Sequence, residues 1–318
     1  MISLVIPVYC NSGNIPALVD ALESLDGKLG GELEVVFVVD GSPDDSYLQL
    51  AARLPAAGFS SQLVSLSRNF GSFAAIRAGL RVARGDRFAV IAADLQEPPE
   101  LIVEFNRILL AGEHDVVVGQ RTSRRDPMVS RLSSSLFWAT YRQFVQPEVP
   151  AGGVDVFGCT RKVRDELLQL DESNSSLVGL LLWVGFRRAA VPYERRERTI
   201  GKSAWTLRKK VRYLMDSVFG FSDLPIRLLL RIGLLGIAVA CVFGATVVVA
   251  RVVGAVPVPG YAATVFTITF FGGLNCFGLG IIGAYVWRTF ENTKHRPNYV
   301  VASHRAFNGD RDGTSGES

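Results

Sequence analysis

Three charged side chains stand directly after apolar segments of strand length in the N-terminal part of the chain. They are Asp40, Arg68 and Asp94. Carboxylates can accept hydrogen bonds from a base and a ribose or bind a cation, and an arginine can neutralise phosphate charge. A nucleoside diphosphate needs these residue types together with backbone NH groups near a helix start. Each residue alone is weaker evidence, since Asp-Gly-Ser is also an ordinary turn and Pro-Pro an ordinary helix start.

The segments around these residues predict a doubly wound α/β domain. Apolar runs predict strands over 3–7, 34–39, 62–67, 87–93 and 115–119, and segments of helical period predict helices over 15–25, 46–53, 72–82 and 99–110. Strands of buried type that alternate with helices imply a mostly parallel sheet. Ligands bind such a sheet outside the carboxyl ends of its strands. The three charged residues are therefore expected at one edge of the sheet.

A set of short motifs between about residues 3 and 225 carries a resemblance to a known family. The motifs are IPVY at 6–9, VDGSPDDS at 39–46, SRNFG at 67–71, ADLQEPPE at 93–100, VGQR at 118–121, VDVFGCTRKV at 154–163, RTIGKS at 198–203 and FSDLP at 221–225. On these motifs the chain resembles family 2 glycosyltransferases of the GT-A fold, in the branch that transfers sugars to polyprenyl phosphates (dolichol or undecaprenyl phosphate). SRNFG together with DLQxPPE is highly specific.

The resemblance implies a nucleotide-sugar site with a divalent metal. Mg²⁺ or Mn²⁺ would be held by Asp94 and Gln96 and would bridge the diphosphate of a UDP- or GDP-linked sugar. The residues implied to bind the nucleotide are Pro7, Tyr9, Val38, Asp40, Arg68, Asn69, Ala93, Asp94, Arg198 and Lys202. The residues implied to act in catalysis are Asp94, Asp155, Arg121 and Arg131. Arg131 also fits a solvated helix position, and Asp155 also fits a turn.

The chain departs from the family pattern at several positions. Ala92 stands where relatives usually have an Asp two residues before the metal Asp, and Val39 stands where they have the first Asp of DDGS. Residues 10–13 lack the usual Glu, and Ala204 replaces the Lys of the GxSK segment, for which Lys202 substitutes at best in part. Fewer carboxylates and one lysine fewer would weaken the hold on a metal, a base or a phosphate.

The C-terminal half contains a long apolar region. Hydrophobic residues make up 48% of the 318 residues, and the mean hydropathy is +0.25. Two runs without charged residues cover 232–250 and 252–287, and a Pro/Gly turn at 256–260 interrupts the second run. A bilayer core takes about 20 apolar residues in a helix. We expect membrane-spanning helices near 232–253 and 262–287. A helical hairpin buried in a soluble core is the alternative.

Charge is distributed unevenly along the chain. Residues 1–186 contain 16 Lys and Arg against 22 Asp and Glu, whereas residues 187–231 contain 12 against 4. An anionic membrane surface attracts such a basic segment, and nucleic acid is the less expected partner. Within it, residues 207–219 predict an interfacial amphipathic helix, with an ordinary helix packed on the domain as the alternative. Basic residues flank both outer ends of the apolar hairpin, which places both chain termini in the cytoplasm of a multi-pass protein of the bacterial inner membrane.

These patterns divide the chain into four parts. They are a cytoplasmic GT-A domain at 1–200, a basic juxtamembrane segment at 201–231, a transmembrane hairpin at 232–288 and a partly disordered cytoplasmic tail at 289–318. The N-terminus resembles a strand and not a signal peptide. The four cysteines are widely spaced without a CxxC pair, which favours reduced thiols over a zinc site or a disulfide framework.

The resemblance predicts an inverting enzyme that moves a sugar from a nucleotide-sugar to a polyprenyl phosphate. The phosphate monoester is already anionic, so no strong general base is required, and Asp155 would orient a sugar hydroxyl or steady charge on the ring. A processive polysaccharide synthase is one alternative, although no QxxRW-type motif is present. A catalytically silent membrane scaffold is another, favoured by Ala92 and Ala204. The sugar and the nucleotide stay open, and small residues in the second span permit a homo-oligomer.

Overall fold

The structure is a computed structural model that describes residues 1–123, 154, 156–172, 176–196, 215–253 and 260–307. The chain divides into two compact units. The sheet unit comprises Met1–Lys210 and Pro297–Ser318, and the hairpin unit comprises Val211–Arg296.

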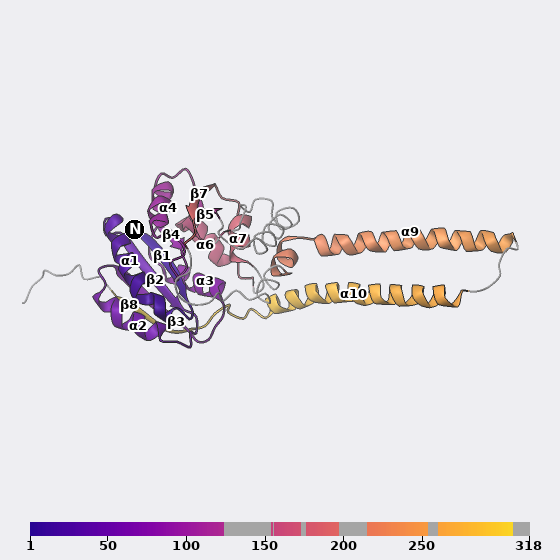
Figure 1. Cartoon of the computed structure of the whole chain (residues 1–318), viewed down its shortest axis with the longest axis horizontal. Helices are drawn as coiled ribbons and strands as arrows, with labels where there is room; N and C mark the ends of the chain where they lie inside the picture. The colour runs from indigo at the N-terminus through magenta and orange to yellow at the C-terminus, as the bar shows by residue number, and fades with distance from the viewer. Residues whose placement is uncertain (124–153, 155, 173–175, 197–214, 254–259, 308–318) are drawn as a thin grey trace, which may run out of the picture. The chain divides into compact units, whose positions relative to one another are not determined.

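A mixed sheet forms the centre of the sheet unit, with the strand order β7-β5-β6-β4-β1-β2-β3-β8 in the described residues (Figure 1). The strands are β1 (Ile2–Val8), β2 (Leu33–Val39), β3 (Ser60–Leu66), β4 (Arg87–Val90), β5 (Val116–Ser123), β6 (Phe157–Thr160), β7 (Arg188–Glu194) and β8 (Val301–Phe307). Strands β4, β1, β2 and β3 are parallel neighbours, and β7 runs parallel to β5. Strand β6 is antiparallel to β4 and β5, and β8 is antiparallel to β3. The predicted, mostly parallel sheet is confirmed.

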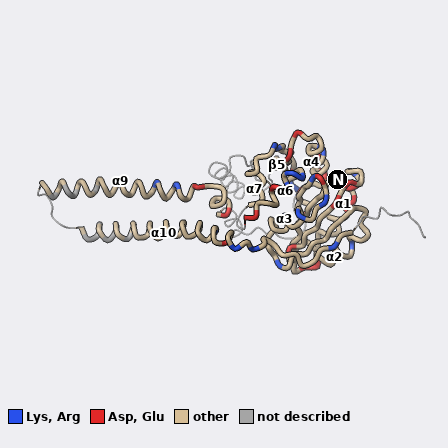
Figure 2. Tube along the Cα trace, turned by 180° about the vertical axis from the view of Figure 1, so that it is seen from behind, with Lys and Arg blue, Asp and Glu red and all other residues tan. Residues whose placement is uncertain are grey.

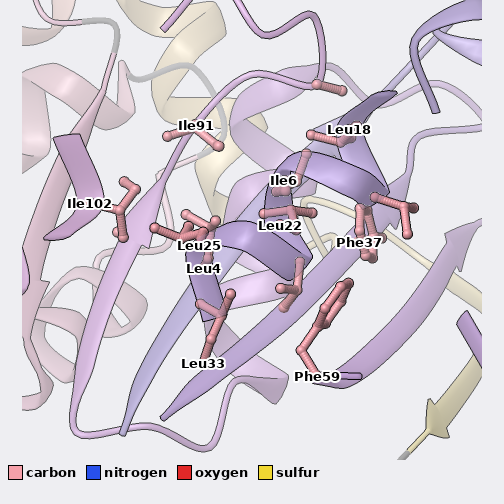
Figure 3. Packing of buried hydrophobic residues seen from close by; sticks show 14 of the residues in the cluster. Leu4, Ile6, Leu18, Leu22, Leu25, Leu33, Phe37, Phe59, Ile91 and Ile102 are labelled. Atoms are coloured by element: carbon pink, nitrogen blue, oxygen red, sulfur yellow. The ribbon is translucent and has the colours of Figure 1, made fainter. Parts of the chain in front are cut away.

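Helices cover both faces of this sheet. The helices of the sheet unit are α1 (Ile15–Lys28), α2 (Ser46–Arg53), α3 (Ser72–Val82), α4 (Glu100–Leu110), α6 (Arg161–Gln169) and α7 (Leu177–Trp183), with 3₁₀ turns η1 (Ser12–Asn14) and η2 (Leu54–Ala56). Apolar residues of α1, α2 and α4 share one core with β1 and β2, and Figure 3 shows Leu18 and Leu22 of α1 close to Ile6 of β1. Burial of these side chains supplies the main driving force for the fold.

Helix α3 packs on the opposite face of the sheet. A Cβ atom added at Gly79 would lie 2.3 Å from Cγ1 of Val5 and 3.0 Å from Cγ2 of Val38. The missing side chain therefore lets α3 approach β1 and β2 closely. Helix α6 lies beside α3, since the Arg164 guanidinium donates to the carbonyl oxygen of Leu80 at 3.0 Å. The doubly wound arrangement predicted for this domain is thus present.

The predicted elements of the first 120 residues coincide with the observed ones within a few residues. Strand β2 is buried along its whole length, which explains its continuous apolar sequence. Strands β7 and β8 were not predicted. Residues 301–307, which the sequence placed in a C-terminal tail, pair with β3 at the edge of the sheet. Most of their side chains are exposed, so they give no apolar signal.

The hairpin unit contains two long helices, α9 (Leu224–Val252) and α10 (Tyr261–Thr293). Both contain stretches long and apolar enough to cross a membrane, Leu224–Thr246 and Phe270–Thr293, and neither stretch is buried within the chain. This exposure does not favour the alternative of a hairpin buried in a soluble core. Charged residues gather where α9 begins and where α10 ends (Figure 2). Most of the predicted amphipathic helix lies outside the described residues, and residues 215–221 are helical.

Candidate active site

Asp40 ties the end of β2 to the start of α3. Its side chain is 2% exposed. One carboxylate oxygen accepts the backbone NH of Phe70 at 2.7 Å, and the other accepts the backbone NH of Gly71 at 2.8 Å. The carboxylate predicted to contact a base or ribose therefore organises the SRNFG loop.

The loops after β2 and β3 also touch through their backbones. A Cβ atom at Gly41 would lie 2.3 Å from the carbonyl carbon of Arg68 and 2.5 Å from the nitrogen of Asn69. Gly41 also has a φ of +56°, in the left-handed region that favours glycine. Arg68 and Asn69 are exposed at this rim. The Arg68 guanidinium lies 3.9 Å from the centre of the Phe70 ring, and its Nη1 donates to the carbonyl oxygen of Asn69 at 3.1 Å, so it places positive charge at this rim.

The loop after β1 is fixed by the loop after β2. The backbone NH of Cys10 donates to Ser42 Oγ at 2.8 Å, and the NH of Ser12 donates to Asp44 Oδ2 at 2.9 Å. Partial burial alone would raise the pKa of Asp44, but hydrogen bonds from Ser42, Ser46 and the NH of Ser12 outweigh it and hold this pKa well below its usual range. The three loops after β1, β2 and β3 consequently form one connected rim.

The turn after β4 carries Asp94 at the same edge of the sheet. Asp94 is half-buried, and its Oδ1 accepts the backbone NH of Gln96 at 3.3 Å. The Gln96 side-chain oxygen, which the sequence assigned to a metal, accepts a hydrogen bond from Arg195 Nη2 at 2.8 Å. In this structure Gln96 thus contacts the end of β7.

Buried Glu97 forms an ion pair with the partly exposed Arg195, a contact that sequence reasoning missed. The Glu97 side chain is 1% exposed, and its Oε1 lies 3.4 Å from Arg195 Nε. Burial raises the pKa of Glu97, and Asp94 acts in the same direction, whereas Arg195 and Arg121 oppose them. Glu97 lies in the quoted motif ADLQEPPE, but nothing in that motif indicates its distant partner. Arg121, at the end of β5 beside Tyr193 of β7, adds a second positive charge near Glu97.

The sequence profile described as Glycosyl transferase family 2 matches residues 3–169, which hold the whole rim from β1 to Arg121. The chain belongs to glycosyl transferase family 2. The family membership and the GT-A type of fold that the motifs predicted are confirmed.

Relatives of this family 2 glycosyltransferase match along nearly the full chain. The bactoprenol glucosyl transferase of Shigella phage SfV is 31% identical over 308 residues, covering 96% of this chain and 99% of that protein. The prophage bactoprenol glucosyl transferase homolog of Escherichia coli (strain K12) is 31% identical over 304 residues, covering 94% and 98%. The uncharacterized glycosyltransferase sll0501 of Synechocystis sp. is 32% identical over 302 residues, covering 95% and 94%.

Solved structures of other glycosyltransferases are similar to part of the chain. Glucosyl-3-phosphoglycerate synthase from Mycobacterium tuberculosis in complex with UDP is 20% identical, with a TM-score of 0.49, and the match covers 70% of this chain and 81% of that one. The same enzyme in complex with Mn²⁺, UDP and phosphoglyceric acid is 19% identical, with a TM-score of 0.49, and the match covers 69% and 76%.

The metal-ligating side chains at the rim of this glycosyltransferase fit a hard cation that the nucleotide-sugar substrate would bind through most of its coordination positions. The described residues contain no group of three or more His, Cys, Asp or Glu side chains that could hold a metal. Asp94 offers one carboxylate at the rim. Mg²⁺ binds readily through one or two carboxylates when substrate phosphates and water supply the other oxygens. The site therefore fits a cation that arrives with a diphosphate.

The other predicted site residues differ in their exposure. Val38 and Ala93 are buried, so their side chains pack within the domain and do not face the rim. Pro7 and Tyr9 are half-buried at the end of β1. Four further predicted residues, Arg131, Asp155, Arg198 and Lys202, lie outside the described residues.

Proposed function

We propose that this glycosyltransferase moves a sugar from a nucleotide-sugar to a polyprenyl phosphate of the undecaprenyl type, with inversion at the anomeric carbon as in family 2. The observation that carries the proposal is the 31% identity to a bactoprenol glucosyl transferase over 96% of the chain, which includes both apolar helices. The product would be a lipid-linked monosaccharide for the cell envelope.

The rim supplies what this transfer needs from the protein. Asp94 would hold Mg²⁺ or Mn²⁺, and the cation would supply charge stabilisation to the departing diphosphate. Arg68 and Arg121 place positive charge at the same rim, where the phosphates of donor and acceptor would lie. Asp40 keeps the loop that carries Arg68 in place. The acceptor phosphate is already an anion, so positioning it in line with the anomeric carbon would be the main task of the site.

The apolar hairpin would anchor the enzyme in the bacterial inner membrane. The described end of α10 carries aromatic residues typical of a membrane interface: Trp287 and Phe290 neighbour each other, and Tyr285 packs against Phe219. Arg288 pairs with Asp216 at 2.6 Å, which fixes residues 215–221 against this end of α10. Basic residues at the start of α9 and the end of α10 favour a cytoplasmic location for both ends. A long isoprenoid acceptor could then react while its tail stays in the lipid.

Product analysis tests this function directly. Purified full-length protein in detergent is incubated with undecaprenyl phosphate, MnCl₂ and, in turn, UDP-glucose, UDP-N-acetylglucosamine, UDP-galactose and GDP-mannose. We expect one donor to give a lipid-linked monosaccharide, and we expect Asp94→Asn or EDTA to abolish its formation. The exposed Asp20→Asn variant is the matched control and should retain activity.

Product analysis and a binding measurement separate the alternatives. A polymeric product would indicate a processive synthase. If titration calorimetry detects no binding of nucleotide-sugar or metal, the protein is a scaffold, the alternative that Ala92 favours because it removes one carboxylate from the metal side of the rim. Either outcome would overturn the proposal.

A further inference from the structure

The turn that presents Asp94 has an unusual backbone conformation. Leu95, the next residue, has a φ of +54°. Residues with a bulky side chain rarely adopt this left-handed conformation, because their Cβ atom then lies too close to the following carbonyl oxygen. Leu95 is half-buried and packs against the main core of the sheet unit. Other contacts must therefore hold the turn in this shape.

The end of β7 makes those contacts through Gln96. The backbone NH of Arg196 donates to the carbonyl oxygen of Gln96 at 2.8 Å, and Gln96 Nε2 donates back to the carbonyl oxygen of Arg196 at 3.3 Å. Arg195 Nη2 donates to Gln96 Oε1 at 2.8 Å. The backbone and the side-chain amide of Gln96 are thus both hydrogen-bonded to Arg195 and Arg196, the two residues that directly follow β7.

Glu97 strengthens the same attachment. Its buried carboxylate lies 3.4 Å from Arg195 Nε, and neither carboxylate oxygen has a hydrogen-bond partner in the part of the chain that the structure describes. The attraction between the buried Glu97 carboxylate and the Arg195 guanidinium is therefore electrostatic. Arg195 reaches Gln96 and Glu97 with the same guanidinium group. We call Gln96, Glu97, Arg195 and Arg196 the clasp.

We propose that Arg195 is a positioning residue for Asp94: through Gln96 and Glu97 it holds the left-handed turn at Leu95, and with it the Asp94 carboxylate, in the orientation that receives the donor's cation. The inference rests on the proposed function, because it assumes a cation-bound nucleotide donor. It gives Gln96 a role in the clasp, since its side-chain oxygen accepts a hydrogen bond from Arg195.

The first test needs neither metal nor substrate. Hydrogen exchange is followed in metal-free, full-length protein for peptides that cover residues 94–100. We expect faster exchange there in Arg195→Gln than in the wild type. The matched control is Arg187→Gln, at the other end of β7, which removes an exposed ion pair with Asp115 and should leave residues 94–100 unchanged. Unchanged exchange in Arg195→Gln would overturn the proposal.

The second test measures the half-saturating Mn²⁺ concentration for binding of the nucleoside diphosphate that the wild type binds, UDP or GDP, by titration calorimetry. We expect Arg195→Gln and Gln96→Ala each to raise this concentration roughly tenfold, and the double variant to raise it no further. A lowered or unchanged concentration in Arg195→Gln, as expected if the guanidinium merely competes with the cation for the Gln96 oxygen, would overturn the inference.

Relief of the strained turn provides a third variant. Leu95→Gly removes the conformational penalty, so the added effect of Arg195→Gln should fall to about twofold in that background. A full tenfold effect there would contradict a role through the turn. The titration distinguishes failure of the clasp from failure of the proposed function. If the wild type shows no Mn²⁺-dependent nucleotide binding, the proposed function is contradicted. If the wild type binds and the Arg195→Gln variant binds equally well, only the role of the clasp is contradicted.

Discussion

Asp40 accepts the backbone NH of Gly71 at 2.8 Å, which joins the carboxyl end of β2 to the amino end of α3. The same carboxylate accepts the NH of Phe70. An acidic residue in a nucleotide site is usually considered for its contact with the ligand. Here its visible role is to shape the loop that carries Arg68, so its loss should affect stability and nucleotide binding together.

Asp40→Asn tests this double role. An amide presents one acceptor oxygen and one NH₂ group, so one of the two backbone NH groups would face a donor. We expect a loss of about 1–3 kcal/mol in the free energy of unfolding, the cost of a buried unsatisfied group, and weaker nucleotide binding. Thermal unfolding and titration calorimetry measure the two effects. Asp45→Asn, at an exposed neighbouring position, is the control; an equal loss in both variants would contradict the interpretation.

Gly41→Ala tests the close approach of the loops after β2 and β3. The new Cβ would lie 2.3 Å from the backbone of Arg68, so the loops must separate. We expect lost nucleotide binding and a clear fall in melting temperature. Gly30→Ala is a matched control, because Gly30 also has a positive φ, +67°, but a Cβ there meets nothing within 4 Å. A similar loss of binding in both variants would show that backbone strain, and not the loop contact, is responsible.

The parallel core and its polar rim could be predicted from the sequence because both follow from local patterns. Fully buried strands such as β2 appear as continuous apolar runs, and residues after parallel strands must meet at one edge. The clasp could not be predicted, since Arg195 and Gln96 are 99 residues apart and only the pairing of β5 with β7 brings them together. Strand β8 was missed for a related reason: it is an exposed edge strand whose partner lies far away in the sequence.

Glu34 gives the sheet unit a defined pH dependence. It is fully buried, and although burial raises its pKa, hydrogen bonds from Ser3, Arg84 and Gln62 outweigh burial and lower the pKa below its ordinary value of 4.5. A group whose pKa is lower in the folded state stabilises the fold above its unfolded pKa. This stability is lost as the pH falls from about 4.5 through the folded pKa.

Glu34→Gln should therefore lower the melting temperature at pH 7 and have a smaller effect as the pH approaches 3.5. The measurement is thermal unfolding of both proteins between these pH values. Glu23→Gln, on the exposed face of α1, serves as the comparison and should follow the wild type throughout. A difference between Glu34→Gln and the wild type that stays constant with pH would show that the carboxylate does not contribute through its charge.

The four cysteines provide an internal probe of membrane orientation. Cys10 is exposed at the rim, and Cys241 and Cys276 lie on the two apolar helices. Cys159 is buried, and burial raises the pKa of its thiol to about 12, so it should not react in the folded protein. A charged, membrane-impermeant maleimide should thus modify Cys10 in inside-out membrane vesicles. In intact cells it should modify none of the four, because Cys10 would lie on the cytoplasmic side and lipid would shield the two helix cysteines.

Nucleotide-sugar should slow the modification of Cys10 in vesicles, since Cys10 lies beside the proposed donor site, and Cys10→Ser should abolish the modification. Modification of Cys10 in intact cells would reverse the proposed orientation, whereas rapid modification of Cys241 and Cys276 in vesicles would contradict the membrane-spanning hairpin.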